Sequence, residues 1–143
     1  MLRKLLLIFA PLAFPTMLFA QCPSPGIWKP ADQHWKAVIE RQGDMLLTTA
    51  TDVNPDGSPW ILKFSVPVKG GAGQVLESTG RFDSVTSRVV MPLIRENTFI
   101  RNGKKARFDH IECGKDGKTF TGTESGVDIH GKPFHGTNVG IRQ

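Results

Sequence analysis

The sequence Lys115-Asp116-Gly117-Lys118-Thr119-Phe120, continued by His130-Gly131-Lys132-Pro133-Phe134 and by Ile141-Arg142-Gln143, decides the predicted fold. Two polar tips that contain glycine bracket two runs in which residues of one character recur at every second position. This alternation is typical of antiparallel strands joined by tight turns. The closing part of the chain is therefore predicted to be a β-hairpin.

The same pattern recurs through the rest of the chain, with Gly-containing tips near residues 43, 57, 70 and 103. Asn102-Gly103 is a strong signal for a two-residue hairpin. The tips imply about nine short strands and no helix. Besides the closing hairpin, strands are expected at 34–41, 45–53, 60–68, 74–77, 84–91, 97–101 and 104–113.

This strand pattern predicts an all-β fold, either a sandwich or a barrel. We favour an antiparallel up-and-down β-barrel of about eight to ten short strands, because short hairpins link neighbours and closure removes exposed edges. On the strand from Trp60 to Val68, the residues Trp60, Leu62, Phe64 and Val66 share one face. On the strand from Ser84 to Met91, Val85, Val89 and Met91 are expected to share a face.

Residues 1–20 are predicted to be a signal peptide, because a basic start is followed by an apolar run that ends at the small residue Ala20. The alternatives are an uncleaved anchor, for which the run is short, and a lipoprotein modified at Cys22. Cleavage would leave an extended tail at 21–33 and a single barrel domain at 34–143, in the bacterial periplasm or secreted. No later stretch is apolar enough to form an integral membrane span.

The formal charge of +5 is modest and the cations are scattered. A nucleic-acid-binding protein is expected to gather its cations on one face, so nucleic acid is not a predicted partner. The two cysteines, Cys22 and Cys113, are expected to form a disulfide, because an even count in an exported chain favours pairing. The alternative is two separate thiols.

Several motifs resemble those of a group of small exported bacterial proteins with a lipocalin-like β-barrel. They are Gly26-Ile27-Trp28-Lys29, Asp116-Gly117-Lys118-Thr119, Gly131-Lys132-Pro133-Phe134, Asn138-Val139 and Gln143. The resemblance implies the barrel fold and brings no activity with it. The chain departs from this group because it has no Tyr and because its cysteines look peculiar to it.

A wider similarity is to lipocalins and fatty-acid-binding proteins, which carry a Gly-x-Trp motif on the first strand. In lipocalins that Trp packs across the barrel floor against an Arg of the last strand. The similarity implies a structural pair of Trp28 with Arg142, held by a cation–π contact.

Residues with catalytic or metal-binding chemistry give no strong motif. No metal site and no cofactor are predicted from the four histidines, because they lack recognised ligand spacing. A Gly-x-Ser-x-Gly elbow is absent, so no catalytic residue is assigned and an enzyme is the least favoured class. The histidines are His34, His110, His130 and His135. Four carboxylates on neighbouring strands are expected to be outward or in turns, with a carboxylate pair as the alternative: Asp109, Glu112, Glu124 and Asp128.

Glycines recur along the last two expected strands, at positions 122, 126, 136 and 140. Glycine in a strand marks a bend, a bulge or the close approach of a ligand or backbone. Small inward residues would leave room for one small ligand, whereas the alternative is a filled core with glycines that serve only twist. The candidate ligand-binding residues are Trp60, Phe64, Arg107, Phe120, Phe134 and Arg142, with Arg107 or Arg142 as an anchor for a ligand carboxylate.

These observations favour an exported barrel that binds or carries a small apolar or amphipathic molecule. The alternative is a protein-interaction or inhibitor module of the cell envelope, which would act through loops or an edge strand and have a filled core. The sequence does not set the oligomeric state.

Overall fold

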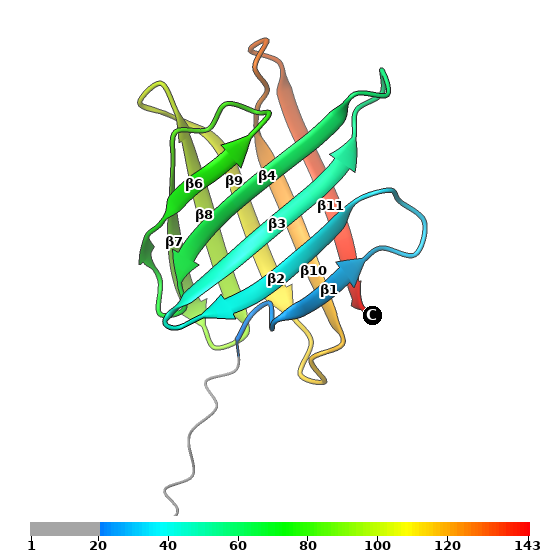
Figure 1. The fold of residues 1–143 in the computed structure, drawn as a ribbon, viewed down its shortest axis with the longest axis vertical. Coiled ribbons are helices and arrows are strands. Elements are labelled where there is room, and N and C mark those ends of the chain that lie inside the picture. Colours follow the sequence, from blue (N-terminus) through cyan, green and yellow to red (C-terminus); the bar gives the residue numbers. More distant parts are fainter. Residues whose placement is uncertain (1–20) are drawn as a thin grey trace, which may run out of the picture.

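The computed structural model describes residues 21–143, which form a nearly closed antiparallel β-barrel (Figure 1). The predicted signal peptide lies outside these residues. The strands are β1 (Gly26–Lys29), β2 (Lys36–Gln42), β3 (Met45–Val53), β4 (Pro59–Pro67), β5 (Gly71–Ala72), β6 (Gln74–Ser78), β7 (Ser84–Met91), β8 (Ile94–Arg101), β9 (Lys104–Cys113), β10 (Thr119–Val127) and β11 (Pro133–Arg142). The all-β barrel prediction is confirmed.

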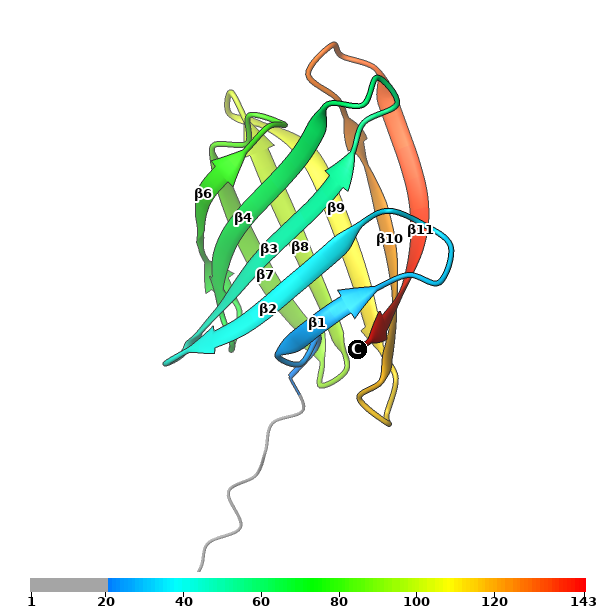
Figure 2. The same ribbon diagram turned by 45° about the vertical axis from the view of Figure 1, so that its right-hand side comes forward.

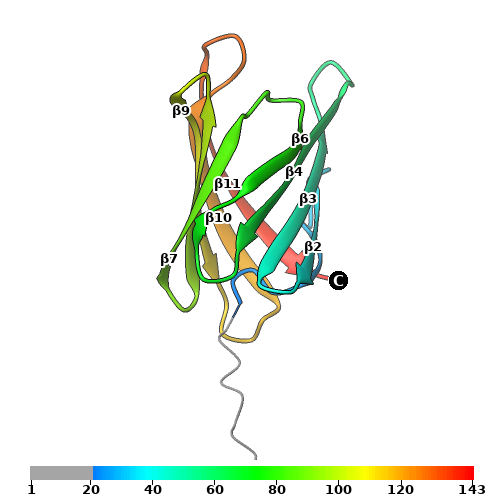
Figure 3. The same cartoon turned by 60° about the vertical axis from the view of Figure 1, so that its left-hand side comes forward.

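Neighbouring strands pair in the order β5-β7-β8-β9-β10-β11-β1-β2-β3-β4-β6. The barrel closes through one segment, because β5 pairs with β7 while β6, two residues further along the chain, pairs with β4. Gly73 lies between them and donates its N–H to the Val85 carbonyl at 2.9 Å. A Cβ at Gly73 would collide with the Ser65 carbonyl, so only glycine fits at this crossing. Figure 3 shows this side of the barrel, with β6 and β7 labelled.

The turns separate into two ends of the barrel (Figures 1 and 2). The turns β3–β4, β6–β7, β8–β9 and β10–β11 lie at one end, which we call the open end. The turns β2–β3, β4–β5, β7–β8 and β9–β10 lie at the other end, where residues 21–25 enter the fold; we call this end the base. Up-and-down connectivity dictates this division, because each hairpin reverses the chain.

The segment expected to be an extended tail contributes a strand to the barrel. β1 pairs with β11 on one side and with β2 on the other, so it joins the two ends of the chain. Trp28 on β1 is 1% exposed and its ring lies 5.1 Å from that of Phe120. The strand was missed because it is short and follows two prolines, so its extended state comes from its partners.

The predicted disulfide between Cys22 and Cys113 is confirmed, and it ties residues 91 positions apart. Trp28 and Arg142 are register partners, as the lipocalin similarity implies. The cation–π contacts within residues 21–143, however, are Arg101 over Phe82 and Arg107 over Trp60, so the implied stack is not among them. The Arg142 side chain runs beside Gly26 instead, where a Cβ would lie 2.9 Å from Nε.

Strands β3, β7 and β9 have the predicted bounds. The alternation on β4 is also as expected, with Leu62, Phe64 and Val66 buried. Met91 differs, because it is 58% exposed instead of sharing the inner face with Val85. The register of β7 against β8 shifts between Val89 and Met91, and such an irregularity turns the following side chain away from the alternation.

Part of the interior is filled by aromatic and aliphatic side chains from β4, β7 and β8. Phe99 is fully buried and meets Phe64 edge to face at 5.1 Å and Phe82 at 5.2 Å. Val85 and Leu62 belong to the same cluster. The described residues contain no helix with the length and hydropathy needed to cross a membrane.

Candidate functional site

A cavity of about 880 Å³ occupies the rest of the interior. Its lining extends from Pro23 and Arg95 at the base to the open-end turns at 54–58, 79–80 and 128–130. Small-molecule sites span roughly 300–1,000 Å³, so the space is large enough for one ligand of drug-like size.

Most of the predicted ligand-binding residues line this cavity. They are Trp60, Phe64, Arg107, Phe120 and Phe134. Arg142 does not line it; it borders a smaller hollow of about 240 Å³ at the base, together with Trp28. Trp35, which precedes β2 and packs against Phe120 at 6.0 Å, lines the cavity and was not predicted.

The four strand glycines serve different purposes. At Gly122 an added Cβ would meet only Phe120 at 3.8 Å and the His110 carbonyl at 4.0 Å, so this glycine opens space in the cavity. At Gly140 a Cβ would collide with the Phe120 ring, and at Gly126 with the Ala106 backbone. At Gly136 it would lie 3.0 Å from Glu124 Oε1. Only Gly122 therefore makes the predicted room, and the others permit close packing.

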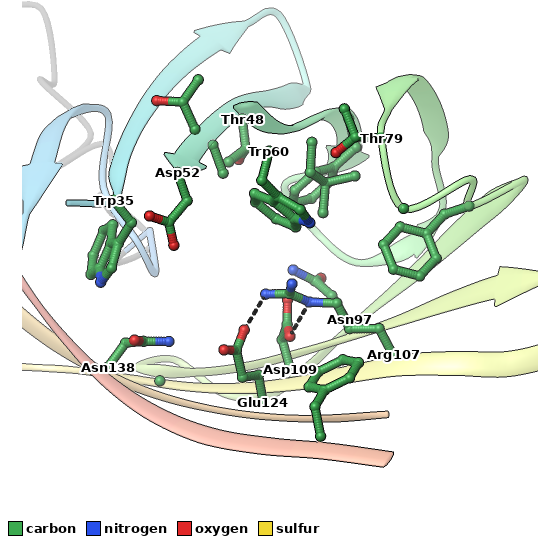
Figure 4. Close-up of a pocket in the computed structure, with 18 of the residues that line it drawn as sticks. Trp35, Thr48, Asp52, Trp60, Thr79, Asn97, Arg107, Asp109, Glu124 and Asn138 are labelled. Carbon is green, nitrogen blue, oxygen red and sulfur yellow. Dashed lines mark hydrogen bonds and ion pairs between the residues drawn. The ribbon is translucent and has the colours of Figure 1, made fainter. Parts of the chain in front are cut away.

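An arginine and two carboxylates form a half-buried ion cluster on β9 and β10 (Figure 4). Arg107 donates from Nε to Asp109 Oδ1 at 2.8 Å and from the second terminal nitrogen, Nη2, to Glu124 Oε2 at 2.6 Å. Its guanidinium also lies 5.3 Å from the centre of the Trp60 ring. Arg107 was expected to anchor a ligand carboxylate, but the protein already gives it two.

The environment of this cluster shifts two pKa values. Burial raises the pKa of Asp109, and the charge and hydrogen bonds of Arg107 oppose this without cancelling it. Burial works to lower the pKa of Arg107, but the charges of Asp109 and Glu124 outweigh it and the pKa is raised. The arginine is therefore firmly cationic, while Asp109 takes up a proton more readily than an ordinary aspartate.

The strand register aligns polar side chains from three neighbouring strands. Asn97 on β8 is opposite Asp109 on β9, which is opposite Glu124 on β10. We call Asn97, Asp109 and Glu124 the acceptor layer. Asn97 is only 3% exposed, yet its Oδ1 has no hydrogen-bond partner within residues 21–143. A buried acceptor without a donor is unusual in a native protein, so the acceptor layer is the least satisfied polar region of the cavity wall.

More polar side chains line the cavity around this layer. Asp52 on β3 projects into the cavity between Trp35 and Trp60, and Thr48 lies on the same strand (Figure 4). Asn138 on β11 lies below Trp35 in the same view. The interior thus combines aromatic walls with a group of hydrogen-bond acceptors.

Arg95 has a different role at the base. It is 3% exposed and donates to the Cys22, Pro67 and Val68 carbonyls and to the Ser87 hydroxyl, at 2.7–3.2 Å. Burial lowers its pKa. These bonds join the N-terminal segment to the β4–β5 turn and to β7, so Arg95 closes the base of the cavity.

The four carboxylates singled out in the sequence divide among three positions, and the expectation that all of them face outward or lie in turns is wrong for two. Asp109 and Glu124 are the inward pair, whereas Glu112 lies outside and contacts His110 Nε2 at 3.0 Å. Asp128 accepts the N–H groups of His130 and Lys132 within its turn. Within residues 21–143, no group of three or more His, Cys, Asp and Glu side chains is arranged to hold a metal ion.

Trp35, Asp52 and Asn97 were missed as site residues. Asn97 has the same strand parity as Phe99, which is a weak signal that it faces inward. Comparisons with protein-family models, with curated proteins and with solved structures found no match for the chain.

Proposed function

We propose that this barrel binds a small, partly apolar molecule in its interior and carries or sequesters it. The observation that supports the proposal is the cavity of about 880 Å³ with aromatic walls. Apolar burial stabilises a complex by roughly 25 cal/mol per Å², so an apolar body enclosed by Trp35, Trp60, Phe64 and Phe120 would supply the main driving force. The alternative of an interaction module requires a filled core, and a cavity of this size weighs against it.

We further propose that the protein acts in the periplasm or outside the cell. The apolar start of the sequence supports export, and the Cys22–Cys113 disulfide is compatible with an oxidising compartment. An exported barrel with an open end would collect its ligand directly from the surrounding fluid.

The test is binding of N-phenyl-1-naphthylamine, a neutral probe whose fluorescence rises in apolar surroundings. Saturable binding near one probe per chain is expected for the folded protein. Gly122→Phe places a ring in the cavity at the strand position where an added Cβ is least hindered, so the affinity should fall about tenfold or more.

The matched control is Thr121→Phe, which adds the same side chain on the outer face of the same strand. It should bind the probe with unchanged affinity, and circular dichroism checks that both variants are folded. Absence of saturable binding to the folded wild type, or equal loss in both variants, would overturn the proposal.

A further inference from the structure

We infer that the molecule bound in this cavity carries a protonated amine, which is held by the acceptor layer and Asp52. The inference rests on the proposed function and adds the chemical class of the ligand. Three features of the cavity wall support it: unsatisfied acceptors, an excess of carboxylates, and tryptophan rings next to them.

The acceptor layer offers oxygens that the protein does not satisfy. Asn97 Oδ1 is buried without a partner. Arg107 occupies one oxygen of Asp109 and one of Glu124, and in the described part of the chain the other oxygen of each has no hydrogen bond. A ligand N–H would satisfy these acceptors, whereas a ligand carboxylate would add further acceptors to them.

The charges of the cavity lining also favour a cationic ligand. Arg95, Arg101 and Arg107 are the lining arginines, and the lining carboxylates outnumber them: Asp52, Asp56, Asp109, Glu124 and Asp128. Arg95 and Arg101 are directed at backbone carbonyls, so among residues 21–143 Arg107 is the arginine that bonds to the acceptor layer. Two carboxylates there outweigh its single charge, and a bound cation would restore neutrality.

Protonation of Asp109 does not reverse this balance. Burial raises the pKa of Asp109, and with Asp109 neutral the Arg107–Glu124 pair has no net charge. Asp52 still faces the cavity from β3 with a negative charge (Figure 4). An anion would therefore meet a negative or neutral wall in either state.

The aromatic rings complete the site. Trp35 and Trp60 lie on either side of Asp52, and the face of Trp60 already accepts the Arg107 guanidinium (Figure 4). Tryptophan faces attract cations, so an ammonium near Asp52 would be stabilised by the carboxylate and by a neighbouring tryptophan ring. The unpartnered Asn97 Oδ1 can accept a hydrogen bond, which a primary or secondary amine can donate and a quaternary ammonium cannot.

The test compares three molecules with one apolar body and different polar groups: 2-(1-naphthyl)ethylamine, 2-(1-naphthyl)ethanol and 1-naphthaleneacetate. Isothermal titration calorimetry with the full mature chain near pH 7 should give about tenfold or more tighter binding of the amine than of the alcohol, with the carboxylate weakest. Equal affinities, a preference for the carboxylate, or binding of none of the three by protein that binds the neutral probe would overturn the inference. Failure of the neutral probe itself would instead overturn the proposed function.

Isosteric variants locate the contact. Glu124→Gln and Asp52→Asn should each weaken the amine about tenfold while the alcohol changes less than about twofold. Glu112→Gln removes a carboxylate from the outer face of the adjacent strand and should leave the amine unaffected. Equal weakening of amine and alcohol would indicate a general loss of cavity shape and would contradict the assigned contact.

Discussion

The base and the open end of the barrel are held by different kinds of interaction. At the base, the Cys22–Cys113 disulfide and the four hydrogen bonds of Arg95 join segments far apart in the sequence. At the open end, Asp56 and Asp128 hold their own turns through bonds to residues within four positions. An exception there is Arg101, which donates to carbonyls of the β6–β7 and β10–β11 turns. Long-range ties limit the conformations of the whole chain, whereas local ones limit a single turn.

We expect the base to contribute most to stability and the open end to serve ligand entry. The base can be rigid because it only has to seal the cavity. Under the proposed function the open end admits the ligand, and a turn held only by local bonds can move without disturbing the barrel. Substitutions at the base should therefore lower the free energy of unfolding, and those in an open-end turn held by local bonds should leave it nearly unchanged.

Removing the disulfide should have the largest effect. Replacing both cysteines, Cys22→Ser with Cys113→Ser, frees a loop of 91 residues in the unfolded chain. The chain-entropy model predicts that the free energy of unfolding falls by roughly 4–5 kcal/mol. Urea unfolding measures the change, with the reduced wild-type protein as a second sample. A loss below about 1 kcal/mol would show that the base does not depend on this bond.

Arg95→Met should have the next largest effect and lower the free energy of unfolding by about 3 kcal/mol. The variant keeps much of the apolar volume but leaves the carbonyls of Cys22, Pro67 and Val68 without this donor, and part of that cost is offset because no charge remains buried. Arg88→Met, at an exposed position on β7, is the control and should change the unfolding free energy little. An Arg95 variant as stable as this control would contradict a sealing role.

Asp128→Asn at the open end should have the smallest effect. The N–H groups of Lys132 and His130 lower the pKa of Asp128, so the folded state binds its proton less readily than the unfolded state, in which the pKa is about 3.9. The carboxylate's contribution to stability is present above the unfolded-state pKa and is lost as pH falls through the folded-state value. Wild type should therefore be slightly more stable than the variant near pH 7 and equally stable near pH 2, as measured by thermal unfolding. A difference that grows in acid would contradict this assignment.

The sequence predicted most strands because alternation and turn residues are local signals. The bounds of β3, β7 and β9 followed from such patterns. β1 and β5 were missed because they are short and contain glycine or follow proline, so their extended state depends on pairing with distant strands. A local sequence pattern does not specify which strands pair with each other.

The candidate site was predicted mainly in its apolar half, with Arg107 as a charged member. Inward aromatic residues such as Trp60 and Phe134 can be recognised by type and parity. The acceptor layer depends on the register of three strands, which a single sequence does not supply. The glycines make the same point, because Gly122 and Gly140 look alike in sequence, yet one borders open space and the other a phenyl ring.

The pairing of β1 with β11 has a consequence for the order of folding. Residues 26–29 find one of their partners only in residues 141–142, and the Gln143 N–H reaches back to the Ile27 carbonyl at 2.9 Å. During synthesis this ladder cannot form until residues 141–142 have been made. The barrel therefore cannot be complete before β11 is available, and a chain that lacks β11 leaves β1 and β10 each with one unpaired edge.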